Sequence, residues 1–119
     1  MDCIFCKIIN SEIPSYKIYE DELVLAFLDI NPKYNGHTLI VPKKHIIDFT
    51  EIDDEYLLHI NKVAKEIVKL LQDKLHATGF CINTNYLDTQ DIKHYHLHIV
   101  PISKEEKKNV EEIYNIITK

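Results

Sequence analysis

The stretch DDEYLLHINKVAKEIVKLLQDKLH, residues 53–76, decides the fold class. Its apolar residues recur mostly at steps of three or four, the spacing of one helix face: Leu57, Ile60, Ala64, Ile67, Val68, Leu71 and Leu75. Asp53 or Asp54 is expected to cap the start of this helix, and Gly79 to reverse the chain after its end. We therefore predict one long helix whose apolar face packs on another layer.

The segments on both sides of this helix have the pattern of β-strands. Three of them precede it and two follow it: residues 17–20, 23–28, 37–42, 79–84 and 93–102. Residues 4–13 and 104–119 are expected to form short terminal helices. Strands before and after one long helix predict an α+β fold with a single antiparallel sheet of about five strands.

Length and charge restrict the possible functions. A chain of 119 residues suits one domain, residues 1–119. Its basic residues are 14 Lys and no Arg, against 19 acidic residues, which argues against nucleic-acid binding. It has no apolar run of the ~20 residues that a membrane helix needs. The N-terminal Met1-Asp2-Cys3 shows no export signal, so a cytoplasmic protein with reduced thiols is expected.

The densest chemical signal is His94-Tyr95-His96-Leu97-His98-Ile99-Val100. In a strand, alternate side chains point to opposite faces, so the three histidines would share one face and line a cleft. Tyr95, Leu97 and Ile99 would pack on the long helix. A neutral imidazole is a good nucleophile toward phosphorus at pH 7. A metal-binding H-x-H row and a row of structurally satisfied histidines are the alternatives.

The cysteines suggest a second kind of site. Cys3 and Cys6 have the C-x-x-C spacing of metal ligands, with redox chemistry as the alternative. Cys81 alternates within an apolar strand and is expected to be buried.

Residues 94–100 resemble the H-φ-H-φ-H-φ-φ signature, with φ apolar, of the histidine triad (HIT) family. Further stretches are similar to the other motifs of that family: residues 3–9 with Ile13-Pro14, residues 25–32 and residues 36–45. The match covers most of the chain and is best for the branch of nucleoside phosphoramidate hydrolases, which are small homodimers.

This resemblance implies roles for individual residues. His96 would attack the α-phosphorus of a purine nucleotide, His98 would contact the phosphate and help the leaving group, and His37 would be a buried partner. Asp29 would accept hydrogen bonds from the ribose. The remaining residues implied in substrate binding are Asn83 and Gln90 for the phosphate, and Ile4, Phe5, Ile8, Phe27, Ile30 and Ile92 around the base. The alternatives are core packing for the apolar residues and a turn-capping role for Asp29.

The resemblance also implies a structural zinc ion held by four residues: Cys3, Cys6, His45 and His94. A homodimer interface is expected along residues 53–76 and 79–84. Two positions depart from the family pattern. Asp91 replaces the usual Ser or Thr before the triad, and Asn85 stands where a Gly is usual. An ionised Asp91 facing the phosphate would repel it.

Four functions are therefore compared. The first is hydrolysis of nucleoside phosphoramidates or related adenylates through a covalent nucleotidyl-His96 intermediate. The others are hydrolysis of dinucleoside polyphosphates, regulatory nucleotide binding with little turnover, and a zinc hydrolase of the H-x-H type. The sequence favours the first.

Overall fold

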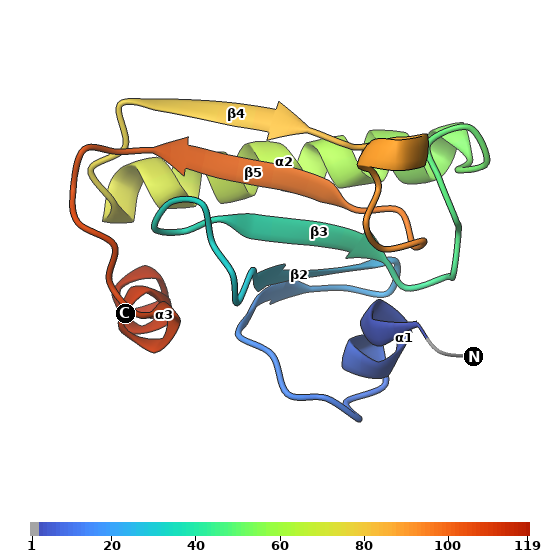
Figure 1. Ribbon diagram of the computed structural model, residues 1–119, viewed down its shortest axis with the longest axis horizontal. Helices are drawn as coiled ribbons and strands as arrows, with labels where there is room; N and C mark the ends of the chain where they lie inside the picture. Colours follow the sequence, from blue (N-terminus) through green and yellow to red (C-terminus); the bar gives the residue numbers. More distant parts are fainter. Residues whose placement is uncertain (1–2) are drawn as a thin grey trace.

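The computed structural model describes residues 3–119, and Met1 and Asp2, with the expectation about an export signal, lie outside the described residues. Five strands form one open antiparallel sheet in the order β1-β2-β3-β5-β4 (Figure 1). The predicted α+β fold is confirmed. The elements in chain order are α1 (Ile4–Ile9), β1 (Lys17–Glu20), β2 (Val24–Leu28), β3 (Thr38–Pro42), α2 (Asp54–Lys74), β4 (Gly79–Asn83), the single-turn helix η1 (Leu87–Thr89), β5 (Leu97–Ile102) and α3 (Val110–Thr118).

Helices cover both faces of the sheet. Alternate residues of β2 face opposite sides, so Val24 and Ala26 join the core beneath α2 and α3, whereas Leu25 and Phe27 pack with α1. All five residues of β2 and all five of β3 are buried, because both faces of these strands are covered. In Figure 1, α2 runs behind the sheet along β4 and β5, and α1 lies beside β2 near the N-terminus.

The triad strand differs from the prediction at its start. β5 begins at Leu97 rather than at residue 93, so His94 and His96 precede the ladder. The main chain is held there by another partner: the Tyr95 N–H donates to the Ile46 carbonyl at 2.7 Å. The expected alternation nevertheless holds, because Tyr95, Leu97 and Ile99 are buried in the core that includes α2.

The terminal helices are also shorter than predicted. α1 ends at Ile9, and Ser11 has a left-handed φ of 62° that a helix cannot continue through. α3 begins only at Val110, where the Asn109 side chain accepts a hydrogen bond from the Glu112 N–H at 2.8 Å.

Three local predictions were wrong. Asp53 is the N-cap residue of α2 but its side chain makes no capping hydrogen bond. Gly79 opens β4, and the glycine with positive φ is Gly36, at +88°. Cys81 is exposed, because β4 is an edge strand with β5 on one side only. No helix within residues 3–119 has both the length and the apolar character needed to cross a membrane.

Candidate functional site

His96 is 3% exposed, and a main-chain contact decides which nitrogen of its neutral ring carries the hydrogen. Its Nδ1 lies 2.8 Å from the His94 carbonyl oxygen. A carbonyl oxygen only accepts hydrogen bonds, so Nδ1 of the neutral ring carries the hydrogen and Nε2 carries the free lone pair. Edge-to-face contacts with Phe5 and His98, at centroid distances of 5.0 and 4.8 Å, hold the ring in this orientation.

A relay of two hydrogen bonds, from the Lys33 N–H to His37 and from His37 to His98, holds His98 in the opposite tautomer. The Lys33 N–H donates to His37 Nδ1 at 3.1 Å, which leaves the hydrogen of His37 on Nε2. His37 Nε2 lies 3.0 Å from His98 Nδ1 and donates to it. The hydrogen of neutral His98 is therefore on Nε2, which is buried and has no hydrogen-bond partner among residues 3–119. A lone pair on His96 and an unused N–H on His98 thus lie side by side.

Burial keeps the rings of the relay neutral. It lowers the pKa of His37 below its ordinary value. The pKa of His98 falls to about 4, because burial and the neighbouring His96 and His37 all disfavour its cationic form. At neutral pH the relay therefore has the uncharged tautomers described above.

Asp29 lies behind this relay. One carboxylate oxygen is 3.7 Å from His37 Nε2, and the other accepts a hydrogen bond from the Asn31 N–H at 2.9 Å. The turn-capping contact considered as an alternative is therefore present. Asn83 of β4 is directly opposite His98 of β5, which brings it to the same face of the sheet.

The apolar residues predicted around a base do not form one open surface. Phe5, Ile8 and Phe27 are buried in the core between α1 and the sheet, with Ile92 packed against them. Ile4 and Ile30 are exposed. Core packing therefore accounts for the buried three, and Phe5 alone of these links the core to the His96 ring.

The segment before the triad positions a carboxylate rather than an amide near His96. The Gln90 side chain is turned away and donates Nε2 to the Ile47 carbonyl at 2.6 Å. Asp91 Oδ1 lies 3.7 Å from His96 Nε2. The non-glycine residue of this loop with a positive φ is Leu87, at 58°, and not Asn85, which stands where the family usually has Gly. The sequence identified Asp91 as a departure, but not the direction of its side chain.

A second cluster is formed by the four predicted metal ligands. One ligand atom from each of Cys3, Cys6, His45 and His94 lies within 4.8 Å of the others. The His94 Nδ1 is 3.3 Å from Cys3 Sγ and 3.5 Å from Cys6 Sγ, and His45 Nδ1 is 3.3 Å from Cys6 Sγ. A zinc tetrahedron with sulfur and nitrogen ligands has edges of roughly 3.5 Å, so the cluster has suitable dimensions.

The chemistry of these groups also fits zinc. His94 Nε2 lies 2.8 Å from the Pro42 carbonyl oxygen and donates to it, so the lone pair of Nδ1 faces the thiols. Burial and the adjacent Cys3 sulfur raise the pKa of the Cys6 thiol to about 11. Two thiolates this close repel each other, and a divalent cation removes that repulsion. His94 therefore belongs to this cluster, and the triad is not one H-x-H metal row.

Asp29, His37 and His98 form the other group in residues 3–119 whose ligand atoms lie within 4.8 Å of one another. The hydrogen bond between the two histidines already satisfies both facing nitrogens.

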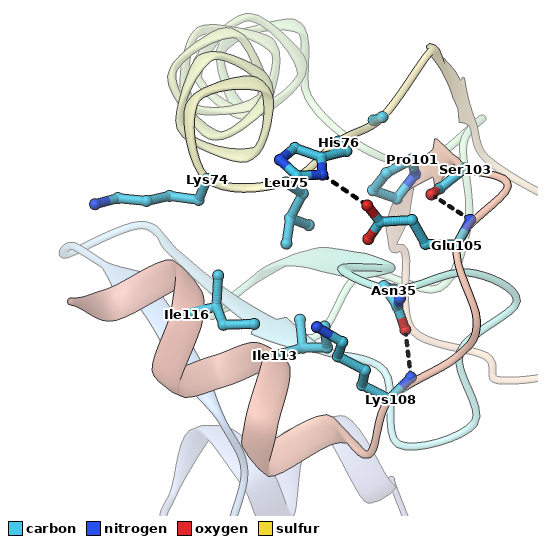
Figure 2. A pocket seen from close by; sticks show the side chains of 11 residues that line it. Asn35, Lys74, Leu75, His76, Pro101, Ser103, Glu105, Lys108, Ile113 and Ile116 are labelled. Carbon is cyan, nitrogen blue, oxygen red and sulfur yellow. Dashed lines mark hydrogen bonds and ion pairs between the residues drawn. The ribbon is translucent and has the colours of Figure 1, made fainter.

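Figure 2 shows a separate cavity of about 120 Å³ between the end of α2, α3 and the segment after β5. It contains none of the predicted site residues. His76 pairs with Glu105 at 2.6 Å across it, and the Lys108 N–H donates to Asn35 Oδ1 at 2.9 Å. These contacts fix the chain between β5 and α3.

Comparisons with known proteins identify the family of this chain. The HIT domain family matches residues 10–105. An uncharacterised HIT-like protein of Methanocaldococcus jannaschii is 52% identical over 101 residues, which cover 83% of this chain and 78% of that protein. The adenosine 5'-monophosphoramidase of Saccharomyces cerevisiae is 41% identical over 108 residues, 91% of this chain and 66% of the relative. The crystal structure of a Zn-bound histidine triad family protein from Mycobacterium smegmatis has a TM-score of 0.89 at 35% identity, covering 98% of this chain and 91% of that one.

Proposed function

This chain belongs to the HIT family, and from that premise we propose that it hydrolyses phosphoramidates of purine nucleotides, or related adenylates, with His96 as the nucleophile. The observation that carries the proposal is the pair of tautomers, a free lone pair on His96 Nε2 beside an unpartnered N–H on His98. The name of the yeast relative, a phosphoramidase, supports the same class of reaction.

The first half of the reaction exchanges the P–N bond of the substrate for a P–N bond to His96. The lone pair of His96 Nε2 forms a bond to the α-phosphorus, and the P–N bond of the substrate breaks with its electron pair on nitrogen. The substrate nitrogen enters the reaction protonated, so it leaves as a neutral amine, while the His98 Nε2–H donates a hydrogen bond to a phosphoryl oxygen. The His37 N–H is donated to His98 Nδ1 throughout and keeps the hydrogen of the neutral His98 ring on Nε2.

The second half restores the enzyme. Water attacks the phosphorus and releases one proton to the solvent, while the bond between phosphorus and His96 breaks and the nucleoside monophosphate departs. Each ring recovers its starting tautomer, so protons balance over the turnover. The His94 carbonyl holds Nδ1–H of His96 throughout and keeps Nε2 directed at the phosphorus.

The remaining predicted residues would bind rather than react. Asp29 would accept from the ribose, and Asn83 would hold the phosphate beside His98. Gln90 would reach the phosphate only after its hydrogen bond to the Ile47 carbonyl breaks. The base would lie against the exposed side chains of Ile4 and Ile30, and the buried Phe5, Ile8 and Phe27, with Ile92, would support this surface from the core.

Zinc would have a structural role in this protein. Cys3, Cys6, His45 and His94 would hold it, and it would supply a cross-link between α1 and the start of the triad segment. His96 and His98 make no contact with this cluster that would divert them from the phosphate. We also propose that residues 1–119 act as one domain, as a homodimer in the cytoplasm.

Replacement of the nucleophile tests the proposal. We expect His96→Ala to lower turnover of an adenosine phosphoramidate by at least about a thousandfold while nucleotide binding is largely kept. His76→Ala, in an exposed ion pair remote from the triad, is the matched control and should keep full activity. AMP release by chromatography and nucleotide affinity by calorimetry measure the two effects. Turnover near the wild-type rate in His96→Ala would refute the mechanism. Tight nucleotide binding without any turnover by the wild type would instead support the regulatory function.

A further inference from the structure

A carboxylate lies at the entrance to the proposed nucleophile. Asp91 Oδ1 is 3.7 Å from His96 Nε2, yet the Asp91 side chain is 79% exposed while that of His96 is 3% exposed. Asp91 therefore faces the reacting nitrogen and the solvent at once.

The backbone on both sides of Asp91 is held by contacts of the neighbouring residues. Lys93 Nζ donates to the Leu87 and Gln90 carbonyls at 3.1 and 3.0 Å, which ties the turn of η1 to the segment that follows it. The Gln90 side chain is anchored on the Ile47 carbonyl. Ile92, on the other side of Asp91, packs on the core beneath α1.

The charge of Asp91 is not cancelled by a basic side chain. Within residues 3–119 its one ion-pair partner is His96. Lys93, two positions away, directs its ammonium group at main-chain carbonyls. A second carboxylate, Asp29, lies on the far side of the relay. The entrance is therefore electronegative, which is an unusual environment for a site that takes an anionic phosphate.

The geometry of displacement shows what this charge acts on. The leaving nitrogen lies opposite His96 across the phosphorus, roughly 5 Å from Nε2 when the reacting atoms are at near-attack distance. A substituent several atoms long on this nitrogen can reach the exposed carboxylate of Asp91, which lies 3.7 Å from Nε2. We infer that Asp91 is a specificity-determining residue that selects phosphoramidates whose leaving amine carries a second, positively charged group. This inference rests on the proposed function and names its substrate class.

The expected effect is moderate. A unit charge on the leaving amine, about 6–8 Å from the Asp91 carboxylate in a largely solvated entrance, should change kcat/KM by about three- to tenfold. A cationic substituent should raise kcat/KM and an anionic one should lower it. Because Asp91 is exposed, added salt should reduce this preference.

Three adenosine phosphoramidates of similar size test the inference, with diaminobutane, pentylamine and aminopentanoate as leaving amines. The wild type should rank them cationic, neutral, anionic in kcat/KM at low salt. Asp91→Asn keeps the shape of the side chain and removes its charge, so it should abolish this ranking. Asp88→Asn, an exposed carboxylate on the same turn, is the matched control and should retain it.

The possible failures are distinct. Turnover of all three substrates without a ranking by charge, or a ranking that persists in Asp91→Asn, would overturn the role of Asp91 and leave the proposed hydrolysis intact. A wild type that cleaves none of the three would overturn the proposed function and this inference with it.

Discussion

Two adjacent histidines acquire different chemical roles because each ring nitrogen has a different partner. The His94 carbonyl holds the proton of His96 on Nδ1, whereas the relay through His37 holds that of His98 on Nε2. The rings need no charged neighbour to set these states, since a carbonyl oxygen and a main-chain N–H define them. The ring with the free lone pair and the ring with the free N–H are therefore neighbours, with centroids 4.8 Å apart.

The pKa of His98 makes stability depend on pH. It is about 4 in the folded protein and ordinarily 6.5, so as pH falls through this range the unfolded chain takes up a proton first. The free energy of unfolding should therefore fall below pH 6.5 by up to about 1.4 kcal/mol per pH unit from this ring, and level off below its folded pKa. Urea unfolding of the wild type and of His98→Gln measures the difference. Parallel pH profiles for the two proteins would show that His98 is not held neutral by the fold.

At this scale the sequence predicted which side chains lie together better than it predicted the direction of single side chains. The histidine row was visible from alternation, and four distant residues do meet as a Cys₂His₂ cluster. The direction of Gln90 and of Asp91 could not be predicted, because the Ile47 carbonyl and the anchoring of Lys93 decide it. These are contacts between segments far apart in the sequence or within an irregular loop.

Among the elements, α1 depends most on tertiary contacts. It has six residues, too few for a stable isolated helix. Packing of Phe5 and Ile8 on the sheet and the Cys/His cluster attach it to the rest of the molecule. A metal ion in that cluster would therefore stabilise both α1 and the triad segment that it touches.

Purified protein should contain about one zinc ion per chain, and Cys3→Ser with Cys6→Ser should remove it. Because metal bound only by the folded state contributes to folding, the double variant should lose about 2 kcal/mol of stability or more. Elemental analysis and thermal unfolding measure both effects. Cys81→Ser, a change to the exposed third cysteine, controls for the loss of a thiol. Zinc-free wild type purified under reducing conditions would contradict this prediction.

The bounds of the first four strands were predicted more accurately than those of the terminal helices and of the segment before the triad. Residues 17–20 match β1, and the predictions for β2, β3 and β4 differ from the structure by one residue at one end. The start of β5 was misplaced by four residues, since the chain before Leu97 pairs with Ile46 and not with β3. Alternation reports which face is buried, but not which segment supplies the hydrogen bonds.

In the whole molecule, the sheet ends at an unpaired edge. β4 has β5 on one side only (Figure 1). Ile82 on this edge is 51% exposed. Leu58 on α2 is 60% exposed. An open strand with exposed apolar side chains favours pairing with another chain. These two elements are the ones that the sequence assigned to a homodimer interface.

We predict that the protein sediments as a dimer at micromolar concentration. Ile82→Lys should shift it toward the monomer, because the charge would be buried at the interface without a partner. Leu23→Lys, at an exposed apolar position outside these two elements, is the control and should remain dimeric. Sedimentation velocity distinguishes the species, and a wild type that sediments as a monomer would contradict the assembly.

The most direct test of the central claim is to trap the covalent intermediate. Enzyme mixed with an adenosine phosphoramidate labelled at phosphorus, then quenched in alkali within one turnover, should carry a nucleotidyl group on His96. Mass spectrometry of the digested protein locates the label, and time points should show it rising and then falling as AMP appears. Label on His98, or continued turnover by a His96→Ala enzyme, would contradict the claim that His96 is the nucleophile.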